Sequence, residues 1–374
     1  MSVKNALYIK QFNRTQLLRL LRQKPISRAE MARQTGLTRA AISMITEELI
    51  KEGLVKESSQ CPQSHARGRS PVLLKLCADG AYAIGIWLGR HGCQLGLCDF
   101  RGQPVAQREL VLSEDSCAGV QQIAHAVEQL LEQTAIPRDR ILGAGICAPG
   151  PVDTAAGKIL IPPNYPYFHN YPIADALSQQ LQLPVYLEKD ANAAALYNYM
   201  DGSFNGRENF ILLSVGRGVG SGVIWQGRLL RTCELGHTCI DYQGPRCACG
   251  NTGCLELYAS TDQIRSRYPG YENWEALISS PHKADILTME AEYLSAAIIN
   301  LTNLLPMDAV LLAGQLHSCW EQLAPLIAAR LKGRSLVIGE KIPEILPALQ
   351  SEAFQIREAC SIVFGHYLKI CPGA

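Results

Sequence analysis

The segment that decides the fold lies past the middle of the chain and combines one imidazole, three thiols and two carboxylates. It reads Glu234-Leu235-Gly236-His237 and then, after a short connection, Cys247-Ala248-Cys249-Gly250-Asn251-Thr252-Gly253-Cys254-Leu255-Glu256. One histidine nitrogen and three cysteine sulfurs form a complete tetrahedral ligand set for zinc. The glycines between the last two cysteines let the chain reverse sharply around a small ion. The sequence therefore predicts a structural zinc bound by His237, Cys247, Cys249 and Cys254.

An alternative interpretation treats these cysteines as reduced thiols in a loop. The chain contains 14 cysteines, and many must pack as small apolar side chains. Cys147, Cys233 and Cys239 are interpreted in that way. Glu234 and Glu256 flank the four ligands, and a closed tetrahedral site needs no further ligand. We expect these two carboxylates to accept hydrogen bonds from a polyhydroxylated ligand.

Length and composition indicate a soluble protein with more than one domain. Its 374 residues exceed the roughly 100 to 200 of a typical domain, and 47% hydrophobic with 18% charged residues suffice for a sizeable core. The N-terminus does not resemble a secretion signal, and no stretch of about 18 apolar residues offers a membrane span. We expect a cytoplasmic protein, whose reduced cysteines favour metal binding over disulfides.

Charge is distributed unevenly along the chain. Residues 1–76 contain 14 Lys and Arg against five Glu, a net charge of +9, so the remaining residues carry −8 of the chain's net +1. A small basic region joined to a larger acidic body predicts that the first part binds a polyanion.

Three short helices are predicted in this basic region. Ser27 and Glu30 form a capping box at the start of the second helix, with Glu30 reaching back, and Gly36 ends that helix. Thr38 is a suitable N-cap for the third helix, which runs to about residue 52. The first helix is marked by a leucine cluster, namely Leu17, Leu18, Leu20 and Leu21.

The third helix has the features of a DNA-recognition helix. Its apolar residues Ile42, Ile45 and Leu49 form an inward stripe, so that small and basic residues face outward at its start. Strands at residues 54–56 and 72–76 flank a loop that suits a wing contacting phosphates or the minor groove. We predict a winged helix-turn-helix domain over residues 1–76; the alternative is a helical unit that binds no nucleic acid. The predicted DNA-binding residues are Thr38, Arg39, Ala40, Ser43, Arg67 and Arg69.

Strand and helix patterns alternate through residues 77–374. Strands are predicted at 83–88, 93–99, 141–146, 185–187, 209–215 and 309–312, with helices at 120–134, 174–181 and about 288–305. This alternation occurs in two rounds and predicts two α/β lobes separated by a cleft. The zinc loop, at about residues 233–256, belongs to this second domain.

The motifs of this region resemble those of the ROK family (repressors, open reading frames and sugar kinases), and the resemblance covers essentially the whole chain. They are Ala148-Pro149-Gly150-Pro151-Val152-Asp153, Asp190-Ala191-Asn192-Ala193-Ala194, the Glu234 to His237 segment and the Cys247 to Glu256 segment. The resemblance implies an actin-like ATPase fold with two lobes and a structural zinc. It also implies a sugar pocket lined by Asp190, Glu234, His237 and Glu256. The N-terminal winged helix places the chain with the family's transcriptional regulators.

Kinase chemistry is not expected. The kinases of the family begin the first lobe with an Asp-x-Gly-Gly-Thr run, whereas this chain has Trp87-Leu88-Gly89-Arg90-His91. An indole cannot support Mg²⁺, which requires oxygen ligands. Asp190 remains at the position of the kinase's general base, but a base without a bound phosphoryl donor has no reaction to perform. The alternative is a ROK-type ATP-dependent sugar kinase that retains a DNA-binding head.

Lys189 precedes Asp190 at a position where the family's kinases typically have asparagine. Lysine only donates hydrogen bonds and pairs with anions, which suggests an acidic sugar or a sugar phosphate as effector. A salt bridge of Lys189 to Asp190 or Glu188 is the equally acceptable alternative.

These observations predict a sugar-responsive DNA-binding regulator that represses genes of carbohydrate uptake or catabolism. Its expected partners are a double-stranded DNA operator and a small sugar effector. No interaction with a membrane is expected. A homodimer or homotetramer is expected, because a dimeric reader matches a palindromic operator. A zinc-stabilised scaffold without a small ligand is a third possibility.

Overall fold

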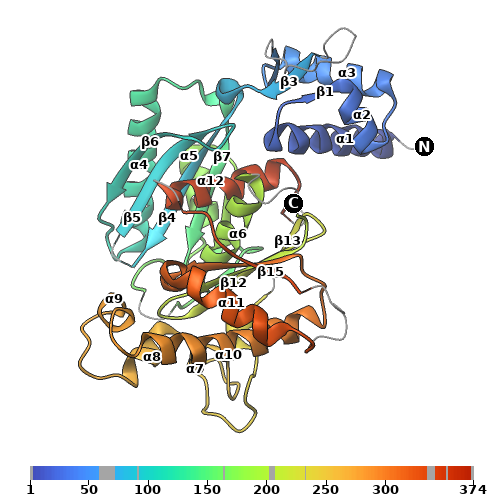
Figure 1. Ribbon diagram of the computed structural model, residues 1–374. Helices are drawn as coiled ribbons and strands as arrows, with labels where there is room; N and C mark the ends of the chain where they lie inside the picture. Colours follow the sequence, from blue (N-terminus) through green and yellow to red (C-terminus); the bar gives the residue numbers. More distant parts are fainter. Residues whose placement is uncertain are drawn as a thin grey trace. The chain divides into compact units, whose positions relative to one another are not determined.

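The computed structural model describes residues 3–58, 72–90, 92–162, 165–201, 207–231, 233–334, 342–350 and 353–371. The chain forms two compact units, and the first contains Met1–Gly206 together with Ser351–Ala374. The second contains Arg207–Gln350. Figure 1 gives the order of their elements.

The first unit begins with three helices and a small sheet. The helices are α1 (Val3–Gln23), α2 (Arg28–Thr35) and α3 (Arg39–Lys51); the strands are β1 (Ile26–Ser27), β2 (Val55–Ser58) and β3 (Leu73–Leu76), in the order β1-β3-β2. Leu17, Met31, Ile42 and Leu49 are completely buried between these elements. This is the architecture predicted for a winged helix-turn-helix.

The caps predicted from the sequence are present at both inner helices. Ser27 Oγ accepts the Glu30 backbone N–H at 3.2 Å, and Thr38 Oγ1 accepts that of Ala41 at 3.2 Å. Gly36 ends α2 with φ 71°, a conformation that glycine adopts without steric cost. The expectation that Glu30 reaches back to Ser27 is wrong, because its carboxylate instead pairs with Arg33 and Gln34 one turn further on.

A five-stranded sheet forms the body of the first unit, in the order β10-β7-β4-β5-β6. Its strands are β4 (Tyr82–Gly89), β5 (Gly92–Asp99), β6 (Pro104–Leu110), β7 (Ile141–Ala148) and β10 (Val185–Lys189), and a separate pair is β8 (Val152–Asp153) with β9 (Lys158–Ile159). Strands β4, β7 and β10 are parallel, whereas β5 and β6 extend β4 as an antiparallel meander.

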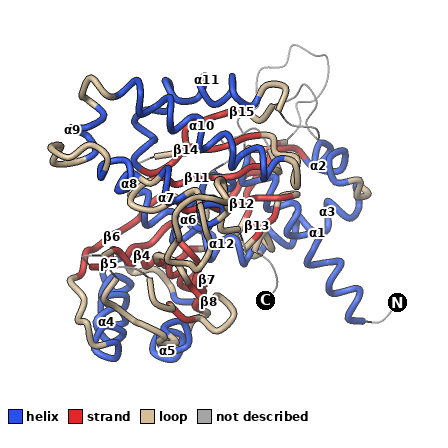
Figure 2. Tube along the Cα trace, turned by 90° about the horizontal axis from the view of Figure 1, so that it is seen from below, coloured by secondary structure: helices blue, strands red, loops and turns tan. Residues whose placement is uncertain are grey.

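Helices cover both faces of this sheet. On one face, α4 (Ser116–Thr134) and α5 (Ile173–Leu181) share an apolar core with alternate residues of β4. On the other lie α6 (Asp190–Asp201) and α12 (Phe354–Tyr367), which pack with Cys147 of β7. Figure 2 shows the two pairs of helices on either side of the strands. The C-terminal helix thus covers one face of a sheet whose strands all lie before residue 190.

Two glycines allow α12 to lie directly on the sheet. A Cβ atom at Gly145 would lie 2.2 Å from the Ala359 carbonyl oxygen, and one at Gly85 would lie 2.7 Å from that of Ile356. The two glycines are register partners on the adjacent strands β4 and β7. Any side chain at either position would push the helix away from the strands.

The second unit repeats the arrangement of the first sheet. Its order is β13-β12-β11-β14-β15, with β11 (Phe210–Val215), β12 (Val219–Trp225), β13 (Arg228–Leu230), β14 (Ala309–Gly314) and β15 (Glu344–Pro347). Strands β11, β14 and β15 are parallel, and β12 and β13 extend β11 as an antiparallel meander. The helices of this unit are α7 (Glu256–Ala259), α8 (Thr261–Ser266), α9 (Trp274–Ile278), α10 (Lys283–Thr302) and α11 (Trp320–Leu331).

The strands and long helices predicted from the sequence are present, with ends that differ by a few residues. Helices α6, α7, α8, α9, α11 and α12 were not predicted, and neither were strands β8, β9, β12, β13 and β15. The glycine segment after β11 is a tight turn at residues 216–218, where the Gly216 N–H donates to the Gly218 carbonyl at 2.9 Å, and β12 begins at Val219. The predicted wing arginines Arg67 and Arg69, and His91, lie outside the described residues. The predicted domain boundary at residue 76 stays a prediction.

Candidate functional site

The four predicted metal ligands lie together in the second unit. One ligand atom from each of His237, Cys247, Cys249 and Cys254 lies within 4.8 Å of the others. The Nδ1 atom of His237 is 3.7 Å from Cys247 Sγ, and the sulfurs of Cys249 and Cys254 are 3.6 Å apart. A tetrahedral zinc with ordinary bond lengths separates two sulfurs by about 3.8 Å and a sulfur from a nitrogen by about 3.6 Å. The donor types and their spacing therefore fit zinc.

The loop that holds these ligands is folded by backbone contacts of its own. Isolated antiparallel bridges join Cys239 to Cys254 and Arg246 to Thr252. Gly253 has φ 64°, and a Cβ atom there would lie 1.6 Å from the Asp241 carbonyl oxygen. The chain can therefore double back at this position only with glycine, as the sequence predicted.

The thiols of the cluster differ in their protonation without a metal. Burial, with hydrogen bonds from the neighbouring thiols, raises the pKa of Cys254 to about 12. A backbone hydrogen bond from Asn251 instead lowers the pKa of the exposed Cys249. A thiol must be deprotonated to bind a metal, so metal binding displaces the Cys254 proton.

Glu256 links the metal loop to the glycine turn between β11 and β12. It is the first residue of α7, and its Oε2 accepts the backbone N–H of Val219 at 2.9 Å. A Cβ atom at Gly218 would lie 2.7 Å from this same oxygen, so the turn must be small there. This contact fixes one of the two predicted sugar-binding carboxylates of the second unit.

The segment of Glu234 is held just as closely. The Ser221 hydroxyl donates to the Cys233 carbonyl and accepts the Leu235 N–H, each at 3.0 Å. A Cβ atom at Gly236 would lie 2.0 Å from the Val219 carbonyl oxygen. Glu234 itself is exposed and His237 is half-buried. Ser221 was not among the residues singled out from the sequence, because a serine inside a strand carries no spacing signal.

Lys189 and Asp190 belong to the first unit. Lys189 is the last residue of β10 and the register partner of Ala148, the last residue of β7. Asp190 begins α6, is exposed, and accepts the Ala191 N–H at 2.7 Å. The carboxyl ends of parallel strands are where open α/β sheets bind ligands.

The surroundings of Lys189 are tightly packed. Lys189 as a whole residue is 6% exposed, and its Cδ would lie 3.0 Å from a Cβ atom at Gly150. The neighbouring Glu188 accepts hydrogen bonds from Asn192 Nδ2 at 2.8 Å and from the Lys189 N–H at 3.0 Å. That Lys189, Asp190, Glu234, His237 and Glu256 line one sugar pocket stays a prediction.

The predicted DNA-reading residues lie at the start of α3. Thr38, Arg39 and Ala40 are exposed, while Ser43 is half-buried. Met44 is 56% exposed on the same helix and was not predicted; its position off the stripe of Ile42 and Ile45 was the available signal. The outer face of α3 is thus exposed, and it carries both small and basic side chains.

We call the N-terminal region of α1, α2, α3 and strands β1 to β3 the head. Several of its basic residues are already paired with acids. Lys10 contacts Glu48 at 2.7 Å, Arg28 contacts Glu57 at 3.0 Å, and Arg14 contacts Glu52 through both nitrogens. Arg39, Lys51 and Lys56 form no ion pair with any residue that the structure describes. The positive charge available to a polyanion therefore comes mainly from unpaired residues such as Arg39, Lys51 and Lys56. The other lysines and arginines of the region contribute less where an acid already neutralises them.

Comparison with known proteins decides the family. Residues 83–338, more than half of the chain, match the ROK family. The chain belongs to the ROK family. The xylose repressor of Bacillus subtilis is 28% identical over an alignment of 383 positions, which covers 98% of this chain and 99% of the repressor.

Solved ROK structures agree with the fold. A crystal structure of a ROK family transcriptional regulator, a homologue of the E. coli MLC protein, is 27% identical with a TM-score of 0.77 and covers 97% of this chain and 98% of its own. A ROK hexokinase from Thermus thermophilus is 26% identical with a TM-score of 0.64 and covers 76% of this chain and 99% of its own. The predicted family and fold class, a helix-turn-helix head with a two-lobed ROK body, are confirmed. No helix in the described part of the chain is both long enough and apolar enough to cross a membrane.

Proposed function

We propose that this ROK protein is a sugar-responsive DNA-binding transcriptional regulator that represses genes of carbohydrate uptake or catabolism. The observation that carries this proposal is the alignment with the xylose repressor over almost the full length of both chains. The ROK transcriptional regulator of known structure covers 97% of this chain, whereas the Thermus thermophilus hexokinase covers 76%, and this difference supports the same assignment. Two or four copies would present paired recognition helices to a palindromic operator.

In this proposal each unit has a defined task. Helix α3 enters the major groove with Arg39, Ala40 and Ser43, Thr38 caps it, and Arg67 and Arg69 of the wing contact phosphates or the minor groove. The sugar is bound by Lys189, Asp190, Glu234, His237 and Glu256. His237, Cys247, Cys249 and Cys254 would hold zinc, which when bound fixes the loop that carries the two glutamates.

Phosphoryl transfer is not part of the proposed function. Trp87 lies in β4 at the position where the family's kinases have an aspartate, and a Cβ atom at Gly89 would lie 2.3 Å from its ring. The indole therefore covers the backbone of the turn and offers no oxygen to Mg²⁺. We infer that the phosphate site is degenerate at Trp87 and Arg90, and by the sequence also at His91.

The test measures DNA binding by fluorescence anisotropy, with the full-length protein and fragments of the promoter next to its own gene. We expect salt-sensitive binding that changes when xylose, glucose, N-acetylglucosamine or a phosphorylated form is added, because an effector acts through its different affinity for the two states. Arg39→Ala should weaken binding, whereas Lys332→Ala, an exposed lysine of the second unit, should not. Absence of salt-sensitive binding to every fragment would refute the proposal.

A coupled assay with ATP and the same sugars addresses the kinase alternative. We expect no turnover above that of the Asp190→Asn variant. Turnover that Asp190→Asn abolishes would establish a kinase that retains a DNA-binding head.

A further inference from the structure

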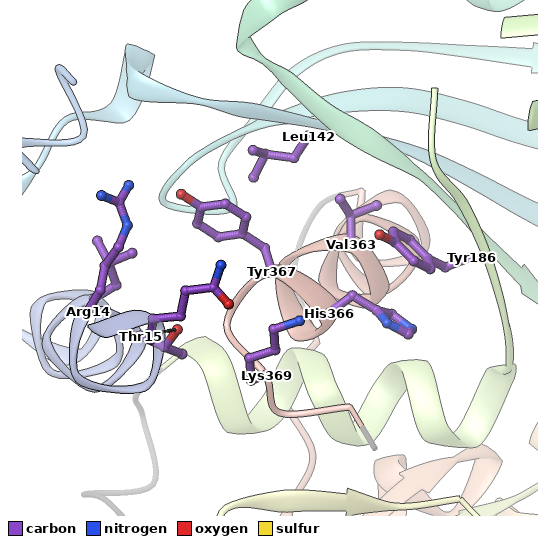
Figure 3. Close-up of a pocket in the computed structure, with 10 residues that line it drawn as sticks. Arg14, Thr15, Leu142, Tyr186, Val363, His366, Tyr367 and Lys369 are labelled. Carbon is purple, nitrogen blue, oxygen red and sulfur yellow. Dashed lines mark hydrogen bonds between the residues drawn. The ribbon is translucent and has the colours of Figure 1, made fainter. Parts of the chain in front are cut away.

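A cavity lies inside the first unit between the first helix of the head and the last helix of the chain. Its volume is about 290 Å³, near the lower end of the roughly 300 to 1,000 Å³ of pockets that bind small molecules. One wall comes from α1, the other from α12 and the turn after it, and Leu142 of β7 and Tyr186 of β10 close the end. Figure 3 shows Tyr367 extending from α12 toward Arg14 of α1, with His366 next to Tyr186.

The walls of the cavity are basic and aromatic. Arg14, His366 and Lys369 line it, together with Tyr186 and Tyr367, and none of the described residues that line it is acidic. Arg14 is already paired with Glu52, whose Oε1 lies 2.6 Å from Nη1. The exposed Lys369 forms no ion pair with any described residue. The net charge offered to a ligand is therefore positive and comes chiefly from Lys369.

The position of Lys369 is set by contacts with the head. Arg19 of α1 donates to the Leu368 carbonyl at 2.9 Å and to that of Lys369 itself. The Lys369 backbone N–H donates to the His366 carbonyl oxygen at 3.1 Å, and Lys369 has φ 54°, where glycine is usual at a helix end. The turn that carries the ammonium group is thus bound to the helix on the opposite wall.

A flat surface lies beside this charge. The His366 ring stacks on Tyr186 with centroids 3.9 Å apart and the planes 9° from parallel. Such a stack supports the ring of a small molecule, while an ammonium group holds its anionic end.

We propose that this cavity binds a small ring-bearing organic anion, a phosphate ester or a carboxylate, and that its occupancy changes DNA binding. A ligand in contact with both α1 and α12 stabilises the arrangement in which the head is attached to the body, so its affinity differs between the attached and detached states. The site uses none of the residues proposed for the sugar. It goes beyond the proposed function by giving the regulator a second effector.

The experiment is calorimetric titration of the full-length protein with inorganic phosphate, glucose 6-phosphate and 4-nitrophenyl phosphate. The Lys189→Met background removes the cation that the predicted sugar site would offer to an anion. We expect binding in that background, tightest for 4-nitrophenyl phosphate because its ring meets the Tyr186 and His366 stack. Lys369→Glu should weaken binding by roughly tenfold or more, the effect of losing a charge-assisted hydrogen bond, and Lys332→Glu should leave it unchanged.

Binding that is equal in Lys369→Glu and the parent, or no binding of any of the three probes, overturns the assignment of the site. Binding that Lys189→Met abolishes would place the anion in the predicted sugar site instead. The coupling to DNA is tested by anisotropy, with 4-nitrophenyl phosphate added to the protein on its promoter fragment. An operator affinity that does not change at saturation overturns the regulatory part.

Discussion

Glu290 is a carboxyl group without a partner in the core of the second unit. It lies in α10, is 0% exposed, and neither of its oxygens has a hydrogen-bond partner among the described residues. Burial raises its pKa well above the ordinary value, an effect that the charge of Arg267 only partly offsets. The native protein therefore keeps this carboxyl protonated at pH values where the unfolded chain releases the proton.

We predict that Glu290→Gln stabilises the protein and that the gain grows with pH. The folded state binds a proton that the unfolded state loses above about pH 4.3, so the free energy of unfolding falls as pH rises from there to the raised pKa. Glutamine has nearly the same shape and no proton to lose. Thermal melts between pH 5 and 8 should show a higher midpoint for the variant and a flatter dependence.

Glu292 on the exposed face of the same helix provides the control. Glu292→Gln should leave both the midpoint and its slope with pH unchanged. A Glu290→Gln protein that melts with the parent's pH dependence would show that the carboxyl is ionised in the fold.

At the metal cluster we predict that Cys249→Ser loses zinc while Cys239→Ser retains it. Both cysteines are exposed and lie in the same loop, but only Cys249 belongs to the cluster. Loss of a direct ligand should weaken zinc binding by more than the 10- to 100-fold typical of outer-shell partners. Elemental analysis after dialysis against a chelator measures the difference, and equal zinc content in the two variants would remove Cys249 from the ligand set.

The ligand set could be predicted from residue types and spacing because all four members lie within 18 positions of one another. Two other contacts could not be predicted from the sequence. They are the hydrogen bond of Glu256 with Val219 and the packing of Lys189 beside Gly150. They join residues that meet only after strands have paired, and single sequences carry no record of such pairing.

At the scale of elements, α1 is fastened to the body by two arginines that bond to carbonyl groups. Arg22 Nη1 donates to Phe100 at 2.7 Å, Arg22 Nε donates to Met200 at 3.2 Å, and the guanidinium lies 4.7 Å from the centre of the Phe364 ring. Burial lowers the pKa of Arg22 to about 10, so the group remains charged at neutral pH. Arg19 makes the corresponding bonds one turn earlier.

We predict that Arg22→Lys destabilises the attachment of α1 by about 2 kcal/mol. A lysine cannot reach both carbonyls with the geometry of the guanidinium, and at least one buried oxygen loses its donor. Hydrogen exchange of α1 amides should accelerate, and the denaturation midpoint should fall. Arg33→Lys is the matched control, because Arg33 makes only an exposed pair with Glu30; an equal loss in both variants would contradict the prediction.

The elements that the sequence predicted are those with local signals. Ser27 and Gly36 mark the two ends of α2, Thr38 marks the start of α3, and the apolar stripe of α3 has a clear period. Helix α12 lacks such a period, because residues 358–365 are buried without interruption. The alanine-rich α6 is buried on nearly every side for the same reason. A helix covered all round has no polar face from which a pattern can be read.

At the scale of the whole molecule, DNA binding should follow the charges that remain unpaired. We predict that the logarithm of the affinity falls linearly with the logarithm of the salt concentration, as counterions are released from the phosphates. Arg39→Ala should reduce the slope by about 1 if Arg39 contacts a phosphate. Lys10→Ala, which removes a cation already bound to Glu48, should change the slope less.

Anisotropy titrations at several salt concentrations give these slopes. Equal changes for Arg39→Ala and Lys10→Ala would mean that the ion pairs within the head do not govern its electrostatics on DNA.

The sequence indicated two rounds of strands and helices, and the structure shows that both sheets have the same order and the same strand directions. It did not indicate that the chain returns to its first sheet after finishing the second. That return depends on the close approach of α12 to two glycines 60 residues apart, a packing match that composition does not reveal.

The return of α12 to the first sheet affects the order in which the chain folds during synthesis. When the ribosome has made the head, the first sheet and the whole second unit, the face of β4 and β7 that carries Gly85 and Gly145 has α6 but still lacks α12. The anchor points of Arg19, at Leu368 and Lys369, do not yet exist either. A nascent or prematurely terminated chain thus exposes part of this sheet face to chaperones and proteases, and its first helix is attached through Arg22 without the two bonds of Arg19.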